Sequence, residues 1–239
     1  MTTKALTSAA AAALDAELMG TVAGYTLEQL MELAGLSVAQ AIYEHWGLPP
    51  QKKQVFVIAG PGNNGGDGLV CARHLKLFGY EPIVFFPKRS SKTPFYTNLV
   101  KQLEFFNIPV LSNDNQWTRY LDHSSTLCVV DAIFGFSFRP PIREPFGTIL
   151  SELKTRQETL PIVAVDVPSG WDVDSGPLQH DAIIPRVLVS LTAPKLCSAK
   201  CDPAATTHYV GGRFIPQHLA AKYGLPALQY TGCKQILRL

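Results

Sequence analysis

The sequence has little net charge, few cysteines and no long apolar run, and each shortage excludes a class of protein. Its 239 residues carry 21 Lys and Arg against 19 Asp and Glu, a formal net charge of +2. Such a balance gives no electrostatic reason to expect nucleic acid or an anionic membrane surface as a partner. No apolar run approaches the roughly 20 residues that a membrane-spanning helix needs. We therefore expect neither a nucleic-acid-binding protein nor a membrane-spanning one.

Cysteines and targeting signals are also scarce. The five cysteines are odd in number, and Cys197 and Cys201 lack the second pair that would complete a tetrahedral zinc site. Reduced thiols in a reducing compartment are the simpler interpretation. The first 50 residues hold one basic residue, Lys4, and only a weakly hydrophobic alanine-rich stretch, which is a poor signal peptide and a poor mitochondrial presequence. The expected location is the cytoplasm, with the mitochondrion as the alternative.

What the sequence does contain is an alternation of buried strands and helices. Hydrophobic residues make up 46% and charged residues 17%, as in ordinary globular proteins. Two helices are expected before about residue 50, at Ser8–Met19 and from a capping box at Thr26. Strands are predicted at Gln54–Ala59, Pro82–Phe86, Ile108–Leu111, Leu127–Val130, Pro161–Val165, Val187–Leu191 and His208–Val210, and helices at Asp67–Phe78, Thr93–Asn107, Phe146–Gln157 and Gln217–Tyr223.

This pattern predicts an α/β fold of one domain over residues 1–239. Nearly continuous Val and Ile runs between helices are typical of a mostly parallel sheet that is covered on both faces. The expected architecture is a Rossmann-like three-layer α/β/α sandwich over about residues 51–230, with an N-terminal helical arm over about residues 1–50.

A glycine-rich loop follows the first predicted strand. Its sequence is Gly60-Pro-Gly-Asn-Asn-Gly-Gly-Asp-Gly68, which satisfies G-x-G-x-x-G between a strand and a helix. Glycines allow a ligand to approach the backbone, and a helix N-terminus can bind phosphate. However, the loop lacks the Lys and Ser/Thr of a P-loop, and the second strand ends at Phe86-Pro-Lys-Arg89 without the acidic residue of most NAD dehydrogenases. The loop therefore favours a nucleotide-like ligand bound in a different way.

Two carboxylates directly follow buried strands. Asp131 and Asp166 come at the ends of β-branched runs, so we expect both at the strand-end edge where open α/β sheets bind ligands. The oxygens of Asn64, Asp131 and Ser169 are hard ligands, and one carboxylate among neutral oxygens suits a monovalent cation better than magnesium. Asp166 then remains free for acid–base chemistry.

Three motifs, in order, resemble those of the NAD(P)H-hydrate epimerase family, whose animal members are also called apolipoprotein A-I-binding proteins. They are Gly60–Gly68, Val130-Asp-Ala-Ile-Phe-Gly135 and Val165-Asp-Val-Pro-Ser-Gly-Trp-Asp172. Thr192-Ala-Pro-Lys195 and the stretch Gly24–Gly35 resemble further parts of the same family, so the resemblance covers about residues 5–230.

The resemblance implies an isomerase that epimerises the R and S forms of hydrated NADH and NADPH and supplies the S form to a separate ATP-dependent dehydratase. It implies potassium at Asn64, Asp131 and Ser169, and a catalytic Asp166 that contacts the reacting ring. The implied substrate contacts are Asn63, Asn64, Gly65, Gly66, Asp67, Gly135, Phe136, Ser137, Phe138, Arg139, Pro140, Pro141 and Asp166. The family usually reads Lys-Gly where this chain has Arg139-Pro140, and proline restricts the backbone there.

Two other functions compete with this one at the level of sequence. An NADP-dependent oxidoreductase would use the same glycine loop, with the basic residues at Lys88 and Arg89 facing a ribose phosphate. A non-enzymatic binding protein would leave Asp131 and Asp166 without a chemical role. The N-terminal helices also suggest a face through which two copies form a homodimer.

Overall fold

A computed structural model of the chain describes residues 4–51, 53–89, 94–112, 116–121, 124, 126–178 and 182–239. Its main sheet has eight strands in the order β3-β2-β1-β4-β5-β8-β9-β10. The strands are β1 (Gln54–Ala59), β2 (Glu81–Phe85), β3 (Val110–Leu111), β4 (Thr126–Ala132), β5 (Ile162–Val165), β8 (Val187–Leu191), β9 (Thr207–Gly211) and β10 (Ile236–Arg238). Every pairing is parallel except that of β9 with β10. The expected Rossmann-like α/β fold is confirmed.

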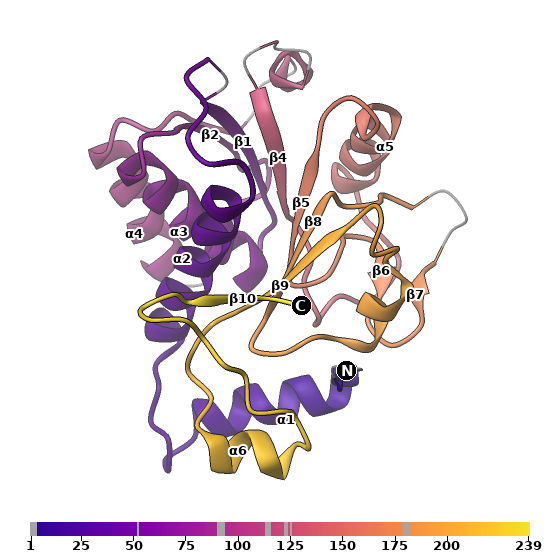
Figure 1. Cartoon of the computed structure of the whole chain (residues 1–239). Coiled ribbons are helices and arrows are strands. Elements are labelled where there is room, and N and C mark those ends of the chain that lie inside the picture. The colour runs from indigo at the N-terminus through magenta and orange to yellow at the C-terminus, as the bar shows by residue number, and fades with distance from the viewer. Residues whose placement is uncertain are drawn as a thin grey trace.

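Successive side chains of each strand point to opposite faces of the sheet, and both faces are apolar. Helices therefore cover both faces. The helices are α1 (Ser8–Leu18), α2 (Leu27–Trp46), α3 (Asn63–Leu77), α4 (Pro94–Phe105), α5 (Phe146–Arg156) and α6 (Gln217–Lys222). In β1, Val55 and Val57 pack in one core cluster with α2, α3 and α4, whereas Phe56 and Ile58 pack in a second cluster with α5. Figure 1 shows these two helical layers on either side of the sheet.

Helix α1 lies apart from both layers, beyond the ends of the strands and next to α6 (Figure 1). Leu14 and Leu18 of α1 share a small core cluster with Phe214 and Leu219. The apolar face of α2 packs on α3 within the chain, with Met31, Val38 and other residues in the main core. The faces that suggested a dimer interface are therefore largely used inside one chain.

Several elements differ from the sequence prediction. Helix α3 begins at Asn63 and not at Asp67, so the predicted glycine loop is mostly the first turn of a helix. The small hairpin β6 (Trp171–Asp172) with β7 (Gly176–Pro177) and the edge strand β10 were not predicted. Each of these strands has only two or three residues, too few for an alternating pattern to show. The start of the predicted helix at Thr93 lies outside the described residues.

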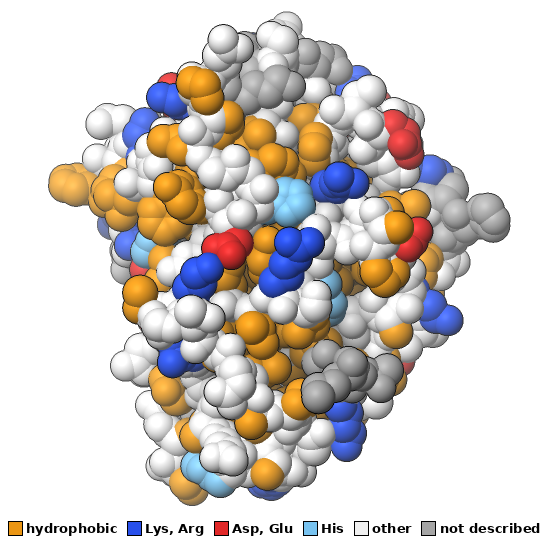
Figure 2. Space-filling view, viewed as in Figure 1, with side chains coloured by type: hydrophobic (Ala, Val, Ile, Leu, Met, Phe, Trp, Pro, Cys, Tyr) orange, Lys and Arg blue, Asp and Glu red, His pale blue; other side chains and the backbone are white. Residues whose placement is uncertain are grey.

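The distribution of charged side chains and the state of the cysteines agree with the predictions from composition. On the face in Figure 2, Lys and Arg side chains lie singly or in pairs among uncharged ones, without a broad basic patch. All five cysteines are free. Among the described residues, no helix combines the length and hydrophobicity needed to cross a bilayer.

Candidate active site

A cavity of about 140 Å³ lies beyond the carboxyl ends of β1, β4, β5 and β8. This is the position at which open α/β sheets bind ligands. Polar residues from five separate segments meet there, and α2 supplies a mostly apolar wall. The polar lining residues are Asp15, Asn63, Asn64, Asp67, Ser137, Asp166, Thr192 and Lys195; Met19, Leu27, Leu30, Met31, Phe136 and Phe214 are among the apolar ones.

Asp166 directly follows β5 and is held by three donors. Its Oδ2 accepts a hydrogen bond from the Phe136 amide at 2.9 Å, and its Oδ1 accepts one from the Leu191 amide at 3.4 Å and pairs with Lys195 Nζ. Asp166 has a left-handed backbone, with φ of 69°, as does Thr192 opposite, with φ of 70°. Non-glycine residues in this region cost roughly 1–2 kcal/mol each and cluster at functional sites. The fold therefore tolerates strain to aim this carboxylate into the cavity.

Lys195 is the partner that the sequence analysis missed. Its side chain is 3% exposed, its Nζ pairs with Asp166 and donates to the Leu191 carbonyl at 2.5 Å, and it lies 5.6 Å from the Phe136 ring centroid. Burying an ammonium group is costly unless it is paired and hydrogen-bonded, as it is here. The motif Thr192–Lys195 contained the signal, a lysine just beyond a buried strand, but no role was assigned to it.

The first turn of α3 contributes three polar side chains. Asn63 Oδ1 accepts from the Tyr96 hydroxyl at 2.7 Å. Both amide atoms of Asn64 are buried, with no hydrogen-bond partner in the part of the chain that the structure describes. Burial raises the pKa of Asp67 well above its usual range, and the nearby carboxylates Asp166 and Asp15 raise it further. This turn therefore presents an unsatisfied amide and a carboxyl group whose pKa is raised.

Three glycines of the loop Gly60–Gly68 allow close packing, and a fourth is open. A Cβ on Gly60 would lie 2.0 Å from the Ile133 carbonyl oxygen, and one on Gly65 would lie 1.8 Å from the Gly60 carbonyl oxygen. A Cβ on Gly66 would lie 2.4 Å from the Met31 sulfur, whereas one on Gly62 would meet nothing within 4 Å. Gly65 and Gly66 do not line the cavity. Contact of these two glycines with the substrate stays a prediction.

The structure divides the predicted segment 135–141 between two cavities. Gly135, Phe136 and Ser137 line the cavity of Asp166, whereas Pro140 and Pro141 line another of about 540 Å³ beside Ser169 and Gly170. Phe138 stacks on Phe134, with ring centroids 4.6 Å apart. Arg139 is exposed and donates from Nη2 to Ser8 Oγ at 3.1 Å. The second half of this segment therefore contacts a different hollow from the first.

Asp131 and Ser169 form a compact cluster next to this site. The Asp131 carboxylate accepts hydrogen bonds from the Ser169 amide at 2.8 Å, the Ser169 hydroxyl at 2.6 Å and the Ile133 amide at 3.3 Å. Asp131 is fully buried, and this burial raises its pKa to about 6 despite the bonds from Ser169. The third predicted cation ligand, Asn64, lies beside Gly135: a Cβ there would be 3.0 Å from Asn64 Oδ1. Among the described residues, His, Cys, Asp and Glu form no metal-ligating group of three or more.

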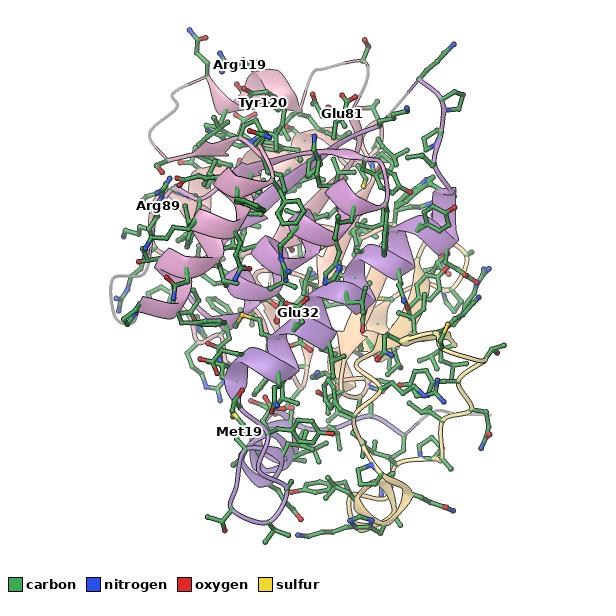
Figure 3. All side chains as sticks on the ribbon, turned by 90° about the vertical axis from the view of Figure 1, so that its left-hand side faces the viewer. Met19, Glu32, Glu81, Arg89, Arg119 and Tyr120 are labelled. Carbon is green, nitrogen blue, oxygen red and sulfur yellow. The ribbon has the colours of Figure 1, made fainter. Side chains whose placement is uncertain are left out.

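Asp15 is a second residue that the sequence analysis missed. It reaches the cavity from α1, and burial raises its pKa to about 6, with a further rise from Asp166 and an opposing effect of Lys195. Figure 3 shows the neighbouring Met19, which also lines the cavity, below the end of α2 that faces α1. The helix is alanine-rich and carries no motif, so no local signal marked its single aspartate.

Comparisons with known proteins agree with the motif-based resemblance. The family model described as YjeF-related protein N-terminus matches residues 27–197. A Saccharomyces cerevisiae protein named NAD(P)H-hydrate epimerase is 59% identical over 244 residues, with 100% of this chain and 99% of that protein covered. One of the same name from Yarrowia lipolytica is 50% identical over 236 residues, with 99% and 93% covered.

A solved structure supports the same relationship. The crystal structure of yeast YNL200c has a TM-score of 0.96 and 59% sequence identity, with 99% of this chain and 100% of that chain covered. The family model spans more than half of the chain, and the relatives cover nearly all of it. The chain is therefore a member of the YjeF-related family to which the NAD(P)H-hydrate epimerases belong.

Proposed function

We propose that this protein is an isomerase that interconverts the R and S forms of hydrated NADH and NADPH. The observation that carries the proposal is the buried Asp166–Lys195 pair, which faces a strand-end cavity together with Asn63, Asn64 and Asp67. The names of full-length relatives at 59% and 50% identity point to the same reaction.

The cavity suits the reacting end of such a substrate. Its volume of about 140 Å³ is below the roughly 300–1,000 Å³ of pockets that enclose a drug-sized ligand. It can thus take one ring, while the rest of a dinucleotide lies outside. The hydrated ring carries its hydroxyl on the carbon next to the ring nitrogen, so loss of that hydroxyl leaves a planar cation. The Asp166 carboxylate would stabilise this cation in a site that excludes water.

We also propose potassium as the bound cofactor. The residues fit such an ion: Asn64 Oδ1 is buried without a partner among the described residues, and Asp131 and Ser169 supply hard oxygens nearby. Asn64, Asp131 and Ser169 would hold the cation, which would supply positive charge and tie together three strand-end segments. Its role would be to fix the Asn64 amide beside Gly135 and the reacting ring.

The alternatives fit the geometry less well. Most NAD dehydrogenases carry an acidic residue at the end of the second strand, whereas β2 is followed here by Phe86-Pro-Lys-Arg89. A binding protein without chemistry has no use for a carboxylate–ammonium pair exposed by 5% and 3% and aimed into a cavity. For this isomerase, a separate ATP-dependent dehydratase that consumes the S form is the proposed functional partner.

Product analysis tests the proposal. The purified protein is incubated with the R hydrate of NADPH, and the two epimers are separated by chromatography against a protein-free control. Conversion to the S form above the spontaneous rate, without net oxidation or reduction, is the expected result. Oxidation of NADPH by a small carbonyl compound at an enzymatic rate would identify an oxidoreductase. No reaction in either assay would leave only a binding protein.

A further inference from the structure

Helix α1 is fixed onto the strand-end edge and is not a loose arm. The Leu6 amide donates to the Pro194 carbonyl at 2.7 Å, and the Leu196 amide donates to the Leu6 carbonyl at 3.0 Å. Leu6, just before α1, is thus hydrogen-bonded to the residues on both sides of Lys195. The Ser8 amide then donates to Asp174 Oδ1 at 2.7 Å. These contacts place the helix against the cavity, beyond the strand ends (Figure 1).

The two acidic residues of α1 point to different surroundings. Glu17 lies at the surface, where it accepts hydrogen bonds from Lys222 Nζ at 2.7 Å and the Tyr223 hydroxyl at 3.0 Å. Asp15 is half-buried and lines the cavity, on a helix whose buried residues are Ser8, Ala11, Leu14 and Leu18. Among the described residues, no hydrogen-bond donor contributes to the pKa shift of the Asp15 carboxylate. A carboxylate that lines the cavity without a donor from the described part of the chain is available to a ligand.

The charged groups that face Asp15 come from three other segments. They are Asp166 at the end of β5, Lys195 after β8, and Asp67 on α3, all on the same cavity. Lys195 gives the Asp166 carboxylate a positively charged partner. Asp15 has no such partner, and burial brings its pKa to about 6, where a group can both give and take a proton near neutral pH. Pairs of carboxyl groups with such different environments mark acid and base roles.

On the basis of the proposed function, we propose that Asp15 is a catalytic residue that acts with Asp166 on the two faces of the hydrated ring. The carboxyl group of Asp15 gives its proton to the ring hydroxyl, the carbon–oxygen bond breaks, and water leaves. The lone pair of the ring nitrogen forms the carbon–nitrogen double bond of the iminium ion.

Inversion follows when water adds from the other face. A new carbon–oxygen bond forms, the double-bond electrons return to nitrogen, and the Asp166 carboxylate takes the proton released by the water. One water has left and one has entered, and one proton has moved from Asp15 to Asp166. Its return to Asp15 through solvent restores the starting state, and the reverse reaction exchanges the two roles. Asp15 belongs to α1, which lies beyond the strand ends in Figure 1, whereas Asp166 directly follows β5, and both residues line the cavity.

The test uses Asp15→Ala in the full chain, because alanine already fills most of this helix and the substitution removes only the carboxyl group. Glu17→Ala, on the same helix, is the matched control. Interconversion of the R hydrate of NADPH is measured between pH 5 and 8, with thermal unfolding of each variant as a check on the fold. Asp15→Ala should lose 10²-fold or more in turnover. The wild type and Glu17→Ala should show turnover that declines as the pH rises above about 6, and Asp15→Ala should lack that decline.

Added formate separates a catalytic role of Asp15 from a structural one, because formate should not restore turnover that is lost through a structural defect. Formate should restore part of the turnover of Asp15→Ala and leave that of Glu17→Ala unchanged. Two outcomes would overturn the assignment of Asp15 without affecting the proposed epimerase function. One is that Asp15→Ala has the turnover and the pH profile of the wild type. The other is an equal loss of turnover in both variants without rescue by formate. A wild-type protein that does not interconvert the epimers would instead overturn the proposed function, and this role with it.

Discussion

An aspartate lies at the end of each of the neighbouring strands β4 and β5, but the two aspartates have different surroundings. Asp131 and Asp166 are both buried, yet Asp131 is surrounded by neutral donors from Ser169 and Ile133, whereas Asp166 faces the ammonium group of Lys195 and an open cavity. Neutral donors fix a carboxylate in place, while an adjacent cavity lets it act on a ligand. Burial and sequence position alone therefore do not separate a structural carboxylate from a chemical one; the partners do.

The largest effect expected from this comparison is on turnover, in Asp166→Asn. The single amide oxygen can accept from the Phe136 backbone or from Lys195 but not from both, so some stability should be lost, while the fold should persist and ligand binding should largely remain. Loss of the charge and of the proton acceptor should lower turnover of the R hydrate by roughly 10²–10⁴-fold. The rate is measured above the spontaneous background, with binding followed separately. Turnover near that of the wild type would transfer the catalytic role to Asp67 or Asp15.

The second largest effect is expected from removal of the Lys195 ammonium group. Lys195→Met leaves Asp166 as a buried carboxylate without its counter-charge, and breaking such a pair typically costs about 3–5 kcal/mol of unfolding free energy. Denaturant titration measures this loss. The double variant Asp166→Asn, Lys195→Met should recover part of it, because no unpaired charge remains. A single variant as stable as the wild type would show that the pair contributes little.

Asp131→Asn should mainly affect stability. Each Asp131 oxygen accepts from at least one donor, so the NH₂ group of an asparagine would face an N–H or O–H group. The free energy of unfolding should therefore fall by about 1.5–3 kcal/mol. At roughly 2–4 °C per kcal/mol, Tm should fall by roughly 3–12 °C. The wild type should also melt at a higher temperature in potassium than in tetramethylammonium at equal ionic strength, since a ligand of the folded state stabilises it. That difference should vanish in Asp131→Asn; identical melting curves of the wild type in both salts would remove the case for the cation.

The smallest expected effect is that of Gly135→Ala. The added methyl group would lie 3.0 Å from Asn64 Oδ1 and 3.1 Å from Asp166 Oδ2, so it enters the space between two site residues without touching Asp131. We expect KM to rise by about fivefold, which corresponds to about 1 kcal/mol, with little change in Tm. Gly62→Ala is the matched control, because its methyl group would meet nothing within 4 Å. Equal KM values for the two variants would contradict this placement.

Much of the sheet and the two strand-end carboxylates could be predicted, because each buried run of β-branched residues ends at a clear polar residue. Lys195 and Asp15 could not be paired with Asp166 from sequence, since 29 residues separate Asp166 from Lys195 and α1 joins the site only through tertiary contacts. The packing role of individual glycines could not be predicted for a related reason. A motif shows where glycine is needed, but only the packed structure shows that the missing Cβ of Gly65 makes room for a carbonyl oxygen.

The docking of α1 also sets an order of events during synthesis. Leu6 pairs with the backbone beside Lys195, 189 residues further along the chain, and Leu14 and Leu18 pack with Phe214 and Leu219. At the ribosome's roughly 5–20 residues per second, the partners of Leu6 appear roughly 10–40 s after Leu6 itself. During that interval the inner face of α1 has no native surface to cover it, which makes it a natural stretch for a chaperone to hold. The cavity would be the last part of the protein to close, after the parallel core is complete.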